Sequence, residues 1–225
     1  MEQNKVYNID CIEGIKQISD KSVKLICTDP PYFLGMTHNG KKGRFVDLAI
    51  CRPFYEILFK EYRRVLADDG CLFWFCDFRS YPFYYQCIEP YFDVTNLIVW
   101  DKMGGPGNKL GFWHEFIVFC TLDKAFNKGG SNVWQIEGFG NPKARKRETQ
   151  EFASQKPNTI ISKIIRDFSK EGDLVLDTFT GSGSTAVACK QLNRNFIGFE
   201  LDCQNFSLIE KRLARGSQEL LFIDV

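Results

Sequence analysis

The chain has 225 residues, a formal net charge of +1, and 44% hydrophobic and 25% charged residues. A chain of this length can bury a core without disulfide or metal staples, and its balanced charge leaves room only for a local polyanion-binding patch. The nine cysteines include no C-x-x-C pair and several stand in apolar runs, so we expect reduced core cysteines in a cytoplasmic protein. Two histidines and no paired ligand spacing predict no metal site.

The ends and the apolar runs of the chain also exclude a membrane segment. The polar N-terminus lacks the basic-then-apolar pattern of a signal peptide, and no apolar run reaches about 18 residues. We therefore expect no membrane partner.

Short apolar runs of strand length alternate with amphipathic stretches of helical spacing. In chain order they predict a strand at 23–28, a helix at 53–70 with Gly70 as its C-cap, strands at 71–78, 94–101 and 116–122, a helix at 159–173, a strand at 173–179, a helix at 185–194, a strand at 194–202 and a helix at 205–216. This alternation predicts one α/β domain over residues 1–225, with an open, mostly parallel sheet and helices on both faces.

Two regions interrupt the alternation. Residues 33–45 are glycine-rich and basic, and residues from about 101 to 155 show no clear periodicity apart from the strand at 116–122. We expect mobile loops or a small inserted lobe there. Each region carries a cluster of cations, which either contacts a polyanion or simply belongs to a solvent-exposed loop. The cations are Lys41, Lys42 and Arg44 in the first region, and Lys143, Arg145, Lys146 and Arg147 in the second.

The strand at 23–28 ends abruptly in Asp29-Pro30-Pro31-Tyr32. In an open α/β sheet, ligands bind beyond the carboxyl ends of the strands, and consecutive prolines make a stiff turn whose carbonyls stay free to accept. A carboxylate and carbonyls beside a flat ring suit an exocyclic amine on a planar base, which would stack on Tyr32. Taken alone, the motif also fits a surface turn.

Residues 173–202 read as a strand, a Gly-x-Gly turn, a helix, a strand and an acidic end. Gly181 and Gly183 permit a tight turn that a ligand can approach, and the following helix offers free N–H groups. Glu200 is placed to accept the two hydroxyls of a ribose. The ligand would be NAD or S-adenosylmethionine. Only one strand follows the turn, which differs from the usual order of an NAD fold.

With both motifs in hand, the chain resembles the DNA amino-methyltransferases, which use S-adenosylmethionine to methylate adenine N6 or cytosine N4. It looks most like the permuted subgroup in which the catalytic motif precedes the cofactor motif. The matching stretches are DPPY (29–32), DTFTGSGST (177–185) with FIGFELD (196–202), QKPNTIISKIIRDFS (155–169) and YNIDCIEGIKQI (7–18). The resemblance implies a Rossmann-like, class I methyltransferase fold. One departure is Thr178, where the family often has proline.

The resemblance also implies a role for each matching residue. The residues that would hold the target amine are Asp29, Pro30, Pro31 and Tyr32. The residues that would line the S-adenosylmethionine site are Asp177, Phe179, Gly181, Ser182 and Gly183 at its methionine part, Thr185 at the helix start, Glu200 at the ribose, Asp10 and Cys11 beside the adenine, Lys156 at the carboxylate end, and Asp29 again.

The predicted function is therefore methylation of DNA adenine N6, with the target base flipped out of the duplex. Asp29 favours adenine, because the family more often has serine there for cytosine. Residues 101–154 are predicted to form a small inserted target-recognition region, and a homodimer is expected by analogy. The alternatives are a cytosine N4-methyltransferase, an RNA or protein amine as substrate, an NAD(P)-dependent oxidoreductase, and an inactive DNA-binding protein.

Overall fold

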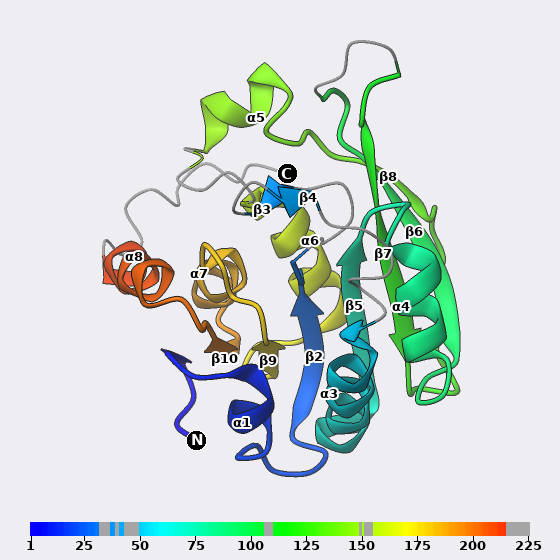
Figure 1. Ribbon diagram of the computed structural model, residues 1–225, viewed down its shortest axis with the longest axis vertical. Coiled ribbons are helices and arrows are strands. Elements are labelled where there is room, and N and C mark those ends of the chain that lie inside the picture. The colour runs from blue at the N-terminus through cyan, green and yellow to red at the C-terminus, as the bar shows by residue number, and fades with distance from the viewer. Residues whose placement is uncertain are drawn as a thin grey trace.

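The computed structural model describes residues 1–31, 50–105, 110–148, 150 and 155–214, and the backbone of two short strands at 37–38 and 41–42. An eight-stranded sheet runs through the molecule with helices on both of its faces (Figure 1). Within the described residues, no helix has the length and apolar character needed to cross a membrane. The predicted α/β fold with an open, mostly parallel sheet is confirmed.

The sheet has the strand order β1-β10-β9-β2-β5-β7-β6-β8. Its strands are β1 (Lys5–Tyr7), β2 (Val23–Thr28), β5 (Leu66–Cys76), β6 (Val94–Asp101), β7 (His114–Thr121), β8 (Val133–Gln135), β9 (Leu174–Asp177) and β10 (Asn195–Phe199). Only β7 runs antiparallel to its neighbours, β5 and β6. A separate antiparallel pair consists of β3 (Thr37–His38) and β4 (Lys41–Lys42).

Helices cover the sheet from both sides, which explains why its strands are apolar on both faces. The helices are α1 (Cys11–Ile15), α3 (Arg52–Val65), α4 (Tyr81–Ile88), α5 (Pro142–Arg147), α6 (Asn158–Phe168), α7 (Ser184–Gln191) and α8 (Cys203–Ala214). Side chains of α1, α3 and α4 share one hydrophobic cluster, and those of α6 and α7 share the other. Seven of the nine cysteines are buried, in keeping with their predicted place in the core.

The prediction that Gly70 caps the helix at 53–70 is wrong. Helix α3 ends at Val65, and Leu66 is already extended, with φ −67° and ψ 134°. Leu66 pairs with Val23 of β2, so pairing within the sheet overrides the helical pattern of the sequence. Gly70 lies inside β5, where a Cβ atom would stand 2.9 Å from the carbonyl oxygen of Ala67. The glycine therefore serves a close backbone approach.

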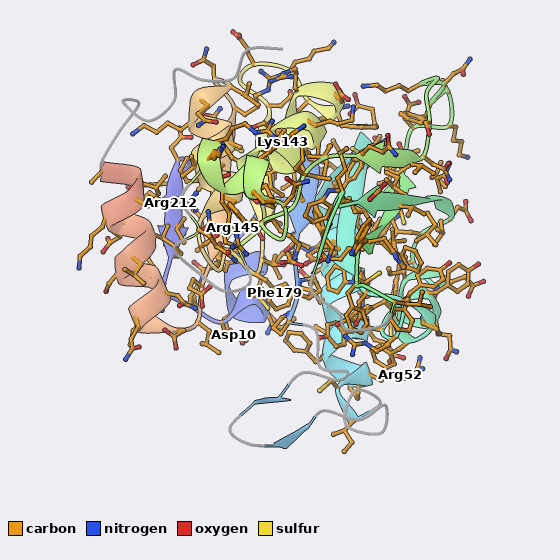
Figure 2. The ribbon with its side chains drawn as sticks, turned by 90° about the horizontal axis from the view of Figure 1, so that it is seen from above. Asp10, Arg52, Lys143, Arg145, Phe179 and Arg212 are labelled. Carbon is orange, nitrogen blue, oxygen red and sulfur yellow. The ribbon has the colours of Figure 1, made fainter. Side chains whose placement is uncertain are left out.

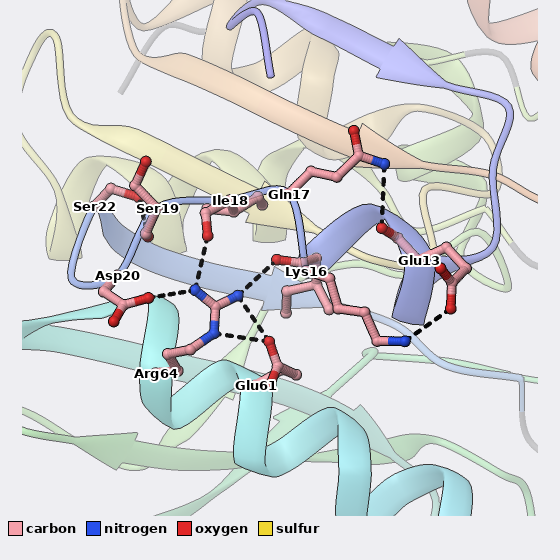
Figure 3. A network of polar contacts seen from close by, with 10 residues as sticks. Glu13, Lys16, Gln17, Ile18, Ser19, Asp20, Ser22, Glu61 and Arg64 are labelled. Carbon is pink, nitrogen blue, oxygen red and sulfur yellow. Dashed lines mark hydrogen bonds and ion pairs between the residues drawn. The ribbon is translucent and has the colours of Figure 1, made fainter.

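Arg64 fastens the segment between α1 and β2 to the last turn of α3 (Figure 3). Its guanidinium donates to the carbonyls of Ile15 (2.9 Å) and Ile18 (2.8 Å), and it pairs with Glu61 and Asp20. These contacts add a charged donor to the carbonyl of Ile15, the last residue of α1, and give a donor to the carbonyl of Ile18 in the turn that follows. The clamp therefore fixes α1, whose other end opens onto the carboxyl edge of the sheet.

Candidate active site

The carboxyl ends of β2 and β9 lie side by side at the centre of the sheet, where Ile26 pairs with Leu176. From β2 the chain continues through α3 to β5 on one side, and from β9 it continues through α7 to β10 on the other. Such a reversal of strand order opens a crevice at the carboxyl edge of an α/β sheet, and ligands bind there. The two motifs singled out in the sequence therefore meet at one place.

A cavity of about 490 Å³ opens at this edge. Its lining includes the predicted residues Asp10, Cys11, Asp29, Pro30, Pro31, Lys156, Phe179, Gly181 and Glu200. A smaller cavity of about 70 Å³ shares part of this lining and adds Asp177, Ser182 and Thr185. Figure 2 shows Asp10 and Phe179 close together when the molecule is seen from above. Segments from both halves of the chain thus form one hollow.

The Gly-x-Gly turn has the backbone conformation that its sequence predicts. Gly181 and Gly183 have φ values of 53° and 80°, in the left-handed region that favours glycine. Gly183 is the N-cap of α7, and a Cβ atom there would stand 3.1 Å from the side chain of Ile209. The amide of Gly181 donates to the carboxylate of Glu200 at 2.8 Å. The turn therefore holds this carboxylate at the wall of the larger cavity.

Asp177, at the end of β9, is a buried carboxylate. It accepts hydrogen bonds from the hydroxyl of Thr28 (2.8 Å) and the amide of Phe179 (3.1 Å). Burial raises the pKa of its carboxyl to about 6; the hydrogen bonds from Thr185, Thr28 and Phe179 oppose this shift, and the charge of Asp29 adds to it. Asp177 thus ties the ends of β2, β9 and α7 together.

The carboxylate of Asp29 forms an ion pair with Lys156, whose Nζ lies 2.6 Å from Asp29 Oδ2. The same ammonium lies 3.4 Å from the carboxylate of Glu115, at the start of β7. Burial disfavours the charged form of Lys156, but the two carboxylates outweigh it and raise the pKa of the ammonium. The sequence predicts Lys156 at the carboxylate end of the cofactor, and that role stays a prediction.

Several residues of the site were given no role by the sequence analysis. The walls of the larger cavity also include Ile9, Phe54, Phe199, Leu201 and Asn205. Glu115 belongs to no motif, and only the sheet brings it to Lys156 and Asp29. Apolar walls of this kind suit a flat ring, which gains from burial without directed contacts.

Arg212, which projects from α8 (Figure 2), contacts the glycine turn. It donates to the carbonyl of Ser182 at 2.8 Å and pairs with Glu148 at 2.9 Å. Glu148 also accepts from the amide of Asn158, the first residue of α6. The turn, the start of α6 and the end of α5 are therefore held by one polar network.

The second basic cluster lies on α5, above the carboxyl edge of the sheet (Figure 1). All four of its cations are exposed: Lys143, Arg145, Lys146 and Arg147. Arg145 donates to the carbonyl of Phe139 and Arg147 pairs with Glu137. In the first cluster, Lys41 and Lys42 lie in β4 and only their backbone is described, while Arg44 lies outside the described residues. Tyr32, the last residue of the Asp-Pro-Pro-Tyr motif, also lies outside them.

Comparison with known proteins identifies the family. Residues 23–211 match the family model described as DNA methylase, of the N6/N4 type. The type II methyltransferase M1.MboII of Moraxella bovis is 30% identical, over 91% of this chain and 94% of that protein. The DNA adenine methyltransferase YhdJ of Escherichia coli (strain K12) is 27% identical, over 94% and 83%.

Solved structures share the fold. The M1.HpyAVI–SAM complex is 27% identical, covers 92% of this chain and 98% of that one, and has a TM-score of 0.67. The PvuII DNA methyltransferase, which is cytosine-N4-specific, has a TM-score of 0.74 at 15% identity, over 94% and 86%, a likeness of fold alone. The match of the family model spans both motifs and the strands from β2 to β10, and the chain belongs to the N6/N4 family of DNA methylases.

Proposed function

We propose that this protein transfers a methyl group from S-adenosylmethionine to the exocyclic amine of adenine N6 in DNA. The observation that carries the proposal is the meeting of the Asp29-Pro30-Pro31 turn and the Gly181–Gly183 turn at one cavity. Methyl transfer by a DNA methylase requires contact between an electrophilic methyl donor and the amine that accepts the methyl group. Two motifs that meet at one cavity would provide this contact.

The cavity suits S-adenosylmethionine in size and chemistry. About 490 Å³ lies within the usual range of roughly 300–1,000 Å³ for small-molecule sites. Its apolar walls, which include Ile9 and Phe199, would hold the adenine, and the Glu200 carboxylate would accept from the ribose hydroxyls. The relative M1.HpyAVI has been solved as a complex with this cofactor. When bound, the cofactor supplies a methyl carbon on a positively charged sulfur.

Asp29 and the carbonyls of its proline turn would orient the target amine. An amine attached to an aromatic ring is a poor nucleophile because its lone pair is delocalised into the ring. Two acceptors hold its hydrogens and return the lone pair to the nitrogen, which then attacks the methyl carbon as the carbon–sulfur bond breaks. The surplus proton of the nitrogen leaves to Asp29 or to solvent. Tyr32 would stack on the base.

Adenine is the proposed base because position 29 is an aspartate. The relative YhdJ is a DNA adenine methyltransferase, which supports this choice. Cytosine N4 is the second candidate, since PvuII methyltransferase, with the same fold, is specific for it. A base in a duplex cannot reach a cavity at the sheet edge, so the proposal includes base flipping.

The proposed DNA surface is the carboxyl edge of the sheet. The exposed cations of α5 lie above this edge and would contact phosphates, and residues 101–154 would supply target recognition. The strand β7 within this region belongs to the main sheet, so recognition would fall to the segments on either side of it. A homodimer remains a prediction from the family resemblance.

Methyl-labelled S-adenosylmethionine and unmethylated DNA test the proposal. After incubation, the DNA is digested to nucleosides and the label is assigned. Label in N6-methyl-2′-deoxyadenosine supports the proposal, and label in N4-methyl-2′-deoxycytidine favours the second candidate. Asp29→Ala should abolish transfer, because it removes the acceptor that would orient the target amine. Label on RNA only, or on neither nucleic acid, would overturn the proposed substrate.

A further inference from the structure

Four largely buried charges form a row at the candidate active site: Lys102, Glu115, Lys156 and Asp29. Lys102 Nζ lies 3.2 Å from Glu115 Oε1, Glu115 Oε2 lies 3.4 Å from Lys156 Nζ, and that ammonium lies 2.6 Å from Asp29 Oδ2. The side chains of Lys102 and Glu115 are each 16% exposed, and that of Lys156 is 10% exposed. The row thus connects the proposed catalytic carboxylate to a carboxylate on β7.

The sheet explains how residues far apart in the sequence come together here. Asp29 follows β2, Glu115 is the second residue of β7 and Lys102 follows β6, so the row crosses the carboxyl edge over β5. Phe75 of β5 presents its ring to the Lys156 ammonium, at 5.5 Å. Lys102 is itself fixed, because its amide donates to the carbonyl of Trp113 at 2.7 Å. Asp29, Glu115 and Lys102 therefore stand at the ends of sheet strands.

The row is electrically neutral, with two cations and two anions. Removing one member of a buried set leaves its partner with an uncompensated charge, which is far more costly than removing a pair. Lys156 depends on both carboxylates, because burial alone would favour its neutral form. Among the described residues, Cys27, Cys76 and Asp177 also lie near this ammonium, and burial raises the pKa of both thiols, so they stay neutral.

We infer that Glu115 is a positioning residue for methyl transfer, which holds the Lys156 ammonium charged and directed at the carboxylate of Asp29. Lys102 completes the neutral row behind it. The inference rests on the proposed function, since it assigns to Glu115 the orientation of the group that accepts the target amine. Glu115 touches neither the larger nor the smaller cavity. Its effect on the reaction passes through Lys156 and Asp29.

Glu115→Gln tests this role with a side chain of the same shape. We expect kcat to fall on the order of 10- to 100-fold, because a misaligned acceptor loses that much rate. The affinity for S-adenosylmethionine should change less than about threefold. The alkaline limb of the kcat profile should move to lower pH, because Lys156 then loses its proton more easily. Glu115→Asp keeps the carboxylate, so its kcat and the position of its alkaline limb should lie between those of wild type and Glu115→Gln.

Two further variants separate positioning from net charge and from general damage. Lys102→Met/Glu115→Gln keeps the row neutral but removes the carboxylate charge beside Lys156, so it should be as slow as Glu115→Gln. Asp167→Asn removes a carboxylate that lies 2.7 Å from Lys163 on α6, outside both cavities, and should behave as wild type. The inference would be overturned if Glu115→Gln had the wild-type kcat and pH profile, or if the double variant recovered the wild-type kcat. It would also be overturned if Glu115→Gln lost affinity for the cofactor by the same factor as it lost kcat.

A measurement without turnover separates this inference from the proposed function. The Lys156 ammonium can be titrated by NMR of protein labelled with carbon-13 at lysine Cε, with Lys156→Arg identifying its signal. We expect the titration midpoint of Lys156 to lie lower in Glu115→Gln than in wild type, and unchanged in Asp167→Asn. An unchanged midpoint in Glu115→Gln overturns the inference. Absence of transfer to DNA by the wild-type protein would instead overturn the proposed function.

Discussion

The hydroxyl of Thr28 donates a 2.8 Å hydrogen bond to the carboxylate of Asp177. This bond joins the last residue of β2 to the last residue of β9, and so joins the two halves of the site. Thr28 is 1% exposed and Asp177 is 6% exposed, so the contact is shielded from water. A hydrogen bond to a buried carboxylate is worth more than one at the surface, because water does not compete for it.

The burial of Asp177 predicts a particular pH dependence of stability. Its pKa is about 6 in the folded protein, above the ordinary value of 3.8, so the folded state binds this proton more tightly than the unfolded chain does. As the pH rises from about 4 to about 6, the free energy of unfolding of wild type should therefore fall relative to that of Asp177→Asn. The total change should be on the order of 3 kcal/mol.

Urea denaturation of both proteins at pH 4 to 8 measures this difference. Other titrating groups are common to both proteins and cancel. Above about pH 7 the difference should become constant, because Asp177 is then ionised in both states. A difference that is independent of pH over the whole range would show that burial does not raise the pKa of Asp177.

Gly183→Ala should weaken binding of S-adenosylmethionine on the order of tenfold or more. A Cβ atom at this position would meet Ile209 at 3.1 Å, and φ is 80°, so the turn must shift to accept it. Gly172→Ala is the matched control, since φ is 81° there and nothing lies within 4 Å of the added atom. Both variants should lose about 1 kcal/mol of stability from the left-handed backbone.

Isothermal titration calorimetry with the cofactor and urea denaturation separate the two effects. A stability loss in both variants, with a change of affinity only in Gly183→Ala, supports the role of the turn. If the two variants bind the cofactor equally well, the turn at Gly183 lies outside the cofactor site.

Lys143→Ala/Lys146→Ala should weaken DNA binding and lower its salt dependence. Each lysine that contacts a phosphate contributes about 0.9 to the slope of log K against log salt concentration, so losing two should reduce the slope by about 2. Fluorescence anisotropy with a labelled duplex at several salt concentrations measures it. Lys60→Ala, an exposed lysine in the middle of α3, is the control and should leave the slope unchanged. An unchanged slope in the double variant would remove α5 from the proposed DNA surface.

Arg64→Met should destabilise the protein by about 2 kcal/mol. The variant leaves the carbonyls of Ile15 and Ile18 without their charged donor, and such hydrogen bonds contribute roughly 1.5–3 kcal/mol. Arg63→Met changes the exposed neighbour in the same turn of α3 and should stay within about 0.5 kcal/mol of wild type. Thermal or urea unfolding compares the three proteins. Equal stability of both variants would mean that the clamp in Figure 3 contributes little.

Local patterns predict the central strands well. The strands at 23–28 and 94–101 occur as predicted, because apolar runs bounded by polar or proline residues leave little freedom. Helix α4 (Tyr81–Ile88) escaped prediction, since its YPFYYQCI sequence has no polar face from which to recognise helical spacing. Strand β1, at three residues, is too short to show a period.

Motifs predict the members of the site that lie next to one another in the chain. The two turns lie where their glycines and prolines imply. The pairing of Lys156 with Asp29 and Glu115 could not be predicted, because these residues come from three separate elements. Which charges meet depends on strand order, and sheet order is a global property that short stretches of sequence do not encode.

Strand β1 pairs with β10, although most of the described chain lies between them. Lys5 to Tyr7 lie beside Ile197 to Phe199, so β1 can join the sheet only after β10 has been made. During synthesis on a ribosome, the early segment with Asp10 therefore waits for residues that emerge much later. Contacts so distant in sequence slow folding, because the chain must close a long loop before they form. A nascent chain should gain its capacity to hold a nucleoside abruptly, once β10 has left the ribosome.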